Sequence, residues 1–348
     1  MLLLPEAAGP HDPVRTGPVR APGSIRRTSS IDTVRPDGLR KESLVTGQAR
    51  DLLTDGDGAT TVLGEATLRA RLAPGGLIEQ AESIPSTPLT GLVGSTVRSG
   101  FRALLARELA DQHDRCTLLY LLLDDLPGAT LVSGYAIQRS GLLGDLVPPE
   151  SGATDDAERR RALSALFRSD VCAGWADEAT LMTTIRKEGE VPVPMGPPAP
   201  SLETPDDPYA WHSMAPLPPH GMRRCRRLDL VAPAGSSGWL VDGHFRDSHV
   251  DEEGRESVLH EYTVAGEIDP VAGRVRSMTA QARVLPWVEC PGAVASAGRL
   301  AGMPMGDLRE QVRRELVGRT TCTHLNDTLR SLADLSVLAS ELSAGLTP

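Results

Sequence analysis

The chain has 348 residues, with 46 acidic against 36 basic side chains, and a formal net charge of −10. Its 40% of hydrophobic residues is enough to build packed cores, which excludes a wholly disordered chain. A non-specific nucleic-acid binder is also disfavoured, because neutralising phosphates requires a concentrated face of Lys and Arg. With 34 Gly and 28 Pro, the chain is expected to contain long loops and linkers.

The amino terminus and the cysteines indicate a cytoplasmic protein with no membrane partner. Residues 1–5 are only briefly apolar and lack the basic start and longer apolar run of a secretory signal. The longest apolar stretch, Leu118 to Leu123, is far too short to cross a bilayer. The five cysteines are an odd number at irregular spacing, so we expect no disulfide framework.

Proline-rich breaks divide the chain into four parts. Residues 1–22 carry five prolines and are predicted to be a disordered leader. Residues 23–149 form a first block, residues 150–221 a helical insert and a Pro-rich linker, and residues 222–348 a second block. The insert has helical character over residues 157–167. Ten prolines between residues 191 and 219 break helices and strand ladders, which predicts an extended linker or surface strap.

The two blocks carry the same motifs in the same order. Residues 44–51 and 240–247 share Leu-Val-x-Gly-x-x-Arg-Asp, and residues 116–119 and 322–325 share Cys-Thr-x-Leu. Between these motifs, each block has two stretches of strand character followed by a helix. The shared order predicts an internal duplication with a degenerate first copy. The expected fold is α+β: two similar units, each an antiparallel sheet with helices packed on one face.

The second block keeps polar, metal-capable side chains that the first block lacks. His324 stands where the first block has Leu118, and the segment that contains Cys290 has no counterpart there. Cys290 is expected at a strand-to-helix turn, where backbone N–H groups would stabilise a thiolate. Cys322 and His324 open the predicted last helix. These residues are candidate metal ligands, with Asp247 or water as the fourth ligand.

An ordinary structural role is the alternative for these residues. Cys-x-His alone is not one of the usual zinc spacings. Cys290 and Cys322 are then small buried hydrophobic residues. His324 is then a core or capping histidine.

The stretch from Leu285 to Leu335, with its Cys-Pro-Gly-Ala and Cys-Thr-His-Leu, resembles a bacterial family known only as a domain of unknown function. It is more distantly similar to the NifU/IscU-type iron–sulfur scaffold. That resemblance implies that Cys290 matches the scaffold's central cysteine and that Cys322 and His324 match its late ligand pair. Asp247 is the nearest candidate for the scaffold's first cysteine. A set with two thiolates, one imidazole and one carboxylate suits Zn²⁺ better than a cluster.

Two further patterns have alternative interpretations. Asp124 and Asp125 are either a carboxylate pair for acid–base chemistry or a solvated turn before Pro127. The basic run at residues 223–227 either binds an anion or belongs to an edge strand whose arginines are exposed to solvent.

Three functions follow from these observations. The first is a metal-binding module, with Zn²⁺ favoured over an iron–sulfur cluster. The second is a metal-free enzyme or binding protein for a small acidic or CoA-linked ligand in the cleft between the copies. The third is a structural partner of another protein. The sequence identifies no catalytic residue.

Overall fold

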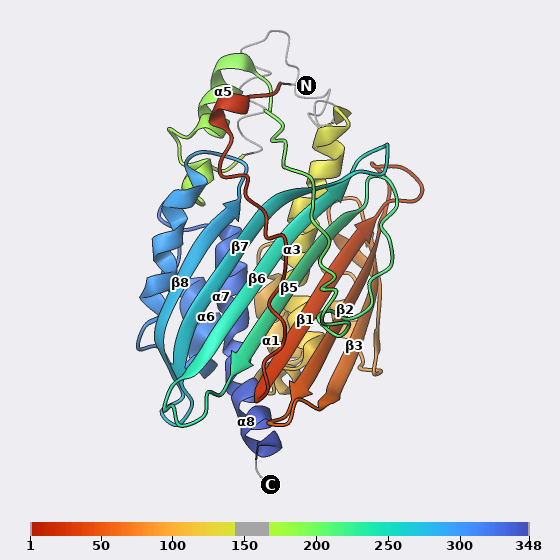
Figure 1. Cartoon of the computed structure of the whole chain (residues 1–348). Helices are drawn as coiled ribbons and strands as arrows, with labels where there is room; N and C mark the ends of the chain where they lie inside the picture. Colours follow the sequence, from red (N-terminus) through yellow and green to blue (C-terminus); the bar gives the residue numbers. More distant parts are fainter. Residues whose placement is uncertain (1, 143–166, 347–348) are drawn as a thin grey trace.

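A computed structural model describes residues 2–142 and 167–346 of the chain (Figure 1). The described residues form one eight-stranded antiparallel sheet in the order β4-β3-β2-β1-β5-β6-β7-β8. The strands are β1 (Ser24–Val34), β2 (Ser43–Thr54), β3 (Thr60–Ala73), β4 (Leu77–Ile84), β5 (Met222–Val231), β6 (Trp239–Val250), β7 (Glu256–Asp269) and β8 (Arg274–Val284). The predicted α+β class is therefore confirmed.

The helices lie mainly on one face of this sheet (Figure 1). The α-helices are α1 (Phe101–Glu108), α2 (Ala110–Asp114), α3 (Leu118–Arg139), α5 (Thr180–Glu188), α6 (Leu308–Glu315), α7 (Thr323–Ser331) and α8 (Leu335–Gly345). Short 3-10 helices span Pro5–Ala7, Thr90–Leu92, Ala173–Trp175, Cys290–Leu300, Met305–Asp307 and Leu332–Asp334. None of the helices in the described part of the chain is long and apolar enough to cross a bilayer. The helix predicted at residues 157–167 falls almost wholly outside the described residues.

The two halves of the chain share one sheet, whereas the sequence predicts a sheet for each unit. β1–β4 and β5–β8 each form a run of antiparallel neighbours, and β1 pairs with β5 along residues 24–33 and 222–231. This pairing joins two strands that would otherwise be open edges, and an open edge exposes unpaired N–H and C=O groups. The halves therefore meet at the centre of a continuous sheet.

Apolar side chains fill the space between the sheet and the helices in two main clusters. The cluster under β1–β4 includes Leu68, Leu72, Phe101, Leu105 and Leu122. The cluster under β5–β8 includes Phe245, Tyr262, Leu308, Leu325 and Leu338. Between the two clusters, the helix face of β1 and β5 carries charged side chains that are also buried. A polar layer therefore separates the two apolar cores.

The other face of the sheet is covered by the N-terminal segment and the Pro-rich strap, which run across the strands in Figure 1. The backbone carbonyls of Val14 and Pro18 each accept a hydrogen bond of 2.9 Å from a buried arginine of the sheet, Arg246 and Arg26 respectively. Residues 2–22 thus pack against the sheet, which differs from the disordered leader expected from their prolines. The reason is that the carbonyls of this extended segment satisfy buried guanidinium groups.

The basic run at residues 223–227 lies in β5, at the centre of the sheet, so the edge-strand interpretation is wrong. Arg223 faces the strap and pairs with Asp32 at 2.7 Å. Arg224 and Arg226 face the helices and are buried. Because these guanidinium groups form ion pairs with carboxylates of the same chain, they are not available to bind an anionic ligand.

Asp124 and Asp125 lie inside helix α3 and are buried, so the predicted solvated turn is also wrong. Asp124 pairs with Arg309 at 2.9 Å and Arg330 at 2.7 Å. Asp125 pairs with Arg226 at 2.7 Å. These ion pairs explain why two adjacent carboxylates are tolerated in the interior.

Candidate functional site

Asp247 is held in one position by the pairing of β5 with β6. It lies directly opposite Arg224 in the ladder, immediately before a bulge in the pairing of β6 with β7. Arg224 Nε donates to Asp247 Oδ1 at 2.8 Å and Nη2 donates to Oδ2 at 3.1 Å. The Asp247 carboxylate has no exposed surface. This geometry fixes the orientation of both carboxylate oxygens.

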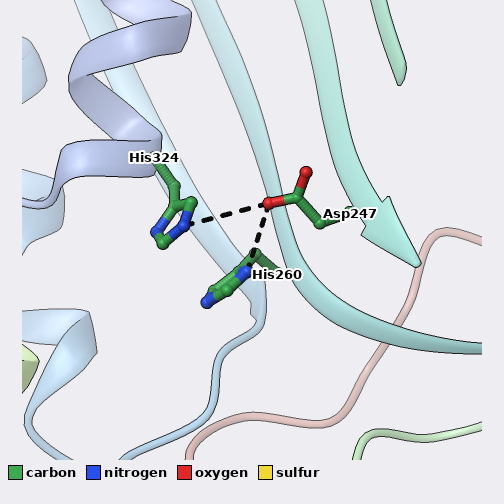
Figure 2. Close-up of side chains that lie close together, drawn as sticks. All are labelled: Asp247, His260 and His324. Atoms are coloured by element: carbon green, nitrogen blue, oxygen red, sulfur yellow. Dashed lines mark hydrogen bonds and ion pairs between the residues drawn. The ribbon is translucent and has the colours of Figure 1, made fainter. Parts of the chain in front are cut away.

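Two histidines approach the same carboxylate oxygen from different elements, as Figure 2 shows. His260 lies opposite Asp247 on β7, and its Nδ1 is 3.2 Å from Asp247 Oδ2. His324 is in the first turn of α7, and its Nε2 is 3.9 Å from the same oxygen. The two imidazole rings stack, with centroids 3.7 Å apart and planes 19° from parallel.

Asp247, His260 and His324 form a compact group of potential metal ligands. One ligand atom from each lies within 4.8 Å of the others, and the described residues contain no other group of three potential ligands this close together. The structure therefore brings together two of the residues chosen from the sequence, Asp247 and His324. It adds His260, which is not among the ligands expected from the sequence.

Cys322 lies on the opposite side of the His324 ring from Asp247. Its Sγ is 3.8 Å from Nδ1 of His324, whereas Nε2 faces the carboxylate. Cys290 begins the 3-10 helix Cys290–Leu300 and packs in the apolar core, outside the ligand group. Burial raises the pKa of the Cys290 thiol well above its ordinary value, and the neighbouring Cys322 raises it further. The expected thiolate is therefore not stabilised, because burial disfavours the charged form.

The charge states of the group follow from its surroundings. Burial opposes ionisation of Asp247, but the adjacent Arg224 and His260 outweigh it and hold the pKa of this carboxyl below its ordinary range. Burial, together with His260, holds the pKa of His324 well below its ordinary value. His324 is consequently a neutral imidazole at pH 7. Its Nε2 is buried and has no hydrogen-bond partner.

The first half of the sheet has the same arginine–carboxylate pair without the histidines. Arg27 lies opposite Asp51, and its Nε and Nη2 donate to the two carboxylate oxygens at 2.7 and 2.6 Å. Gly64 lies opposite Asp51, where the second half has His260 opposite Asp247. A Cβ atom on Gly64 would lie 3.7 Å from Leu118. The arginine therefore satisfies this carboxylate without help from an imidazole.

A network of ion pairs connects the site to the helices of both halves. Arg224 Nη1 donates at 3.0 Å to Asp125 of α3 and to Asp327 of α7. Asp327 is also bound by Arg102 of α1 at 2.9 Å. The site is therefore part of a buried network in which these arginines and carboxylates form ion pairs with one another.

Residues 222–338 match the model of the family DUF2889, which is described as a protein of unknown function. The match covers β5–β8 and the helices that follow them, including Asp247, His260 and His324. No curated protein and no solved structure matches the chain.

Proposed function

We propose that the chain is a metal-binding protein in which Asp247, His260 and His324 hold a divalent cation, with Zn²⁺ the best match. The observation that carries the proposal is the buried, unpartnered Nε2 of His324. It faces Asp247 Oδ2 at 3.9 Å, which is too long for a hydrogen bond. A cation between the two atoms satisfies both. Two imidazoles and one carboxylate make a ligand set found in catalytic zinc sites, which leave a fourth position to water.

The distances in the group are close to those that zinc requires. Zinc bonds of about 2.0–2.2 Å place the ligand atoms of a tetrahedral site roughly 3.3–3.6 Å apart. The 3.2 Å between His260 Nδ1 and Asp247 Oδ2 is near that value, and the 3.9 Å to His324 Nε2 requires a small closure. The rings must also turn out of their stacked arrangement, because imidazole lone pairs lie in the ring plane and planes only 19° apart do not direct them to one point.

Cys322 acts in this proposal as a positioning residue for His324. The two nitrogens of an imidazole point in different directions, so a cation on Nε2 is out of reach of a thiol that faces Nδ1. A metal-ligating histidine commonly uses its second nitrogen to contact a neighbouring polar group, which fixes the ring. The proposed ligand set contains no thiolate, which favours zinc over an iron–sulfur cluster. Cys290 has no role in the set.

The proposal includes the internal duplication, with the second copy as the functional half. Because the first copy satisfies its Arg27–Asp51 pair without histidines, the histidines of the second copy are not needed to compensate the carboxylate. Their presence therefore supports a role in binding.

Metal analysis of the full chain, purified without chelators, tests the proposal. We expect about one zinc ion per chain, since a single group of three ligands is proposed. The variant His260→Gly/His324→Leu carries the residues of the first copy at both positions and is expected to lose the metal. His113→Gln is the control, because His113 lies on the short helix α2, outside the ligand group. Wild-type protein without metal and without a thermal shift on adding Zn²⁺ would contradict the proposal.

A further inference from the structure

A second feature of the helix side of the sheet is a cavity of about 920 Å³ between the two halves of the chain. The loop between β1 and β2, the turn between β3 and β4, and helices α1 and α3 line most of it. Arg313 of α6, Thr323 and Asp327 contribute from the second half. Small-molecule sites commonly have volumes of about 300–1,000 Å³. The cavity is therefore large enough for a ligand of cofactor size.

The lining is strongly cationic although the chain as a whole is acidic. Six basic side chains and one carboxylate, Asp327, line the cavity in a chain with a net charge of −10. The basic residues are Arg35, Arg40, Lys41, Arg98, Arg102 and Arg313. Asp327 is already bound by Arg102 and Arg224 and adds little negative potential. A concave wall lined by one sign of charge concentrates the field and attracts an oppositely charged ligand.

Several of these cations have no carboxylate beside them in the described part of the chain. Lys41 and Arg98 are exposed, and none of the ion pairs between described residues involves either of them. Arg35 donates to the backbone oxygen of Ser133 at 3.1 Å and to its hydroxyl at 2.8 Å. Burial lowers the pKa of Arg35, as expected for a guanidinium without a nearby anion. An anionic ligand would provide the missing compensation.

The backbone around the cavity also favours an anion. Helix α1 begins after Gly100, which has a φ of +91°, and no side chain caps its first turn. Arg102 and Ala103 of this turn line the cavity, so the positive end of the helix dipole faces it. The β3–β4 turn contributes Gly75 and Gly76, and a Cβ atom on Gly75 would lie 3.6 Å from Arg98 Nη2.

The cavity wall is apolar away from the basic residues. Leu39, Val97, Leu131 and Ile137 belong to the lining, and Leu131 has 59% of its surface exposed. A ligand with an anionic group and an apolar part would match both regions of the wall.

We propose that this cavity binds a phosphate-bearing small molecule with an apolar part. Guanidinium groups and the N-terminus of a helix together provide the donors that phosphate oxygens accept from. The arginines at residues 223–227, which the sequence analysis considered for an anionic ligand, are not part of this lining. The inference does not depend on a metal at Asp247.

Calorimetric titration of the full-length chain, stripped of metal and kept in EDTA, tests the cavity with inorganic pyrophosphate as the probe. The double variant Lys41→Gln/Arg98→Gln is expected to weaken pyrophosphate binding by about tenfold or more, because it removes two charge-assisted contacts. The matched control Arg69→Gln/Arg107→Gln removes two exposed charges that lie outside the lining. It should change the affinity by less than about twofold.

Three results would overturn this inference: no binding at about 10 mM pyrophosphate, equal weakening in both double variants, or tighter binding of citrate than of pyrophosphate. The last result would assign the cavity to polycarboxylates. Since the titration uses metal-free protein, it can fail while the zinc proposal holds, and the reverse.

Discussion

Arg224 is the residue on which the site depends most. Its guanidinium contacts three carboxylates, those of Asp247, Asp125 and Asp327, and lies over the ring of Phe245 at 5.0 Å. Its side chain is 1% exposed. A buried ion network of this kind is costly to break, because removing one partner leaves buried charges without compensation.

We therefore predict that Arg224→Met lowers the free energy of unfolding by about 3–5 kcal/mol, the usual cost of breaking a buried pair. Urea denaturation measures this change. Arg69→Met is the control, since the Arg69–Glu82 pair is 3.4 Å apart and mostly exposed. It should change stability by no more than about 0.5 kcal/mol. A loss below about 1 kcal/mol for Arg224→Met would mean that the network is not needed for stability.

Among single residues, the sequence identified only part of the group of potential ligands that the structure brings together. Asp247 and His324 were found because the repeated motifs singled them out. His260 was missed because it meets Asp247 through strand pairing beside a bulge, and that register cannot be read from spacing. Aligning His260 with Gly64 would have been the signal, since the first half of the chain has neither histidine at the matching positions. The cysteine ligands were favoured because the sequence does not show that their thiols are buried away from Asp247.

Helix α3 crosses the polar layer at Pro127 and Gly128. A Cβ atom on Gly128 would lie 1.9 Å from Arg224 Nη1 and 2.4 Å from Asp327 Oδ2. Both neighbouring groups are fixed by their ion pairs, so neither can move aside without loss. Glycine in the middle of this helix is therefore explained by close packing.

Gly128→Ala should lower the free energy of unfolding by about 2–3 kcal/mol, the range for overpacking a buried position. Gly134→Ala, in the same helix, is the matched control, because a Cβ atom there meets nothing within 4 Å. It is expected to be neutral or to stabilise by about 0.5–1 kcal/mol through helix propensity. Thermal and urea unfolding of both variants check the prediction, and similar effects of the two changes would refute the packing argument.

The strap is attached to the sheet through His212. Its ring nitrogens are 2.9 Å from the hydroxyl of Thr28 and 2.8 Å from that of Ser30, both on β1. Burial, together with the nearby Arg50 and Arg223, lowers the pKa of His212 to about 4. The folded state therefore keeps this imidazole neutral.

This shift predicts a loss of stability in mild acid. The folded pKa of about 4 lies below the ordinary value of 6.5, so the contribution of His212 is complete above pH 6.5 and is lost as the pH falls towards 4. The slope is at most about 1.4 kcal/mol per pH unit for one such histidine. His212→Gln should flatten the dependence of unfolding free energy on pH in this window. His113→Gln is the control, because His113 lies on helix α2 and its side chain is 26% exposed; an unchanged slope in His212→Gln would contradict the prediction.

At the scale of the whole molecule, one sheet carries a helical layer on one face and extended segments on the other. Two antiparallel strands in each half of the chain, and a helix after them, were predicted from the matched segments. The pairing of β1 with β5 was not, because these strands are some 190 residues apart and their polar residues are typical of exposed edges. The packing of residues 2–22 against the sheet was also not predicted. It depends on the buried Arg26 and Arg246, whose guanidinium groups bind backbone carbonyls of this segment.

X-ray absorption at the zinc edge of the metal-loaded full chain identifies the atoms that bind the metal. A site formed by Asp247, His260 and His324 should give a first shell of nitrogen and oxygen atoms only, at about 2.0–2.2 Å, with the outer-shell scattering of two imidazoles. This shell should disappear in His260→Gly/His324→Leu. Sulfur scatterers at about 2.3 Å would instead show that Cys290 or Cys322 binds the metal. That result would contradict the assignment to Asp247, His260 and His324.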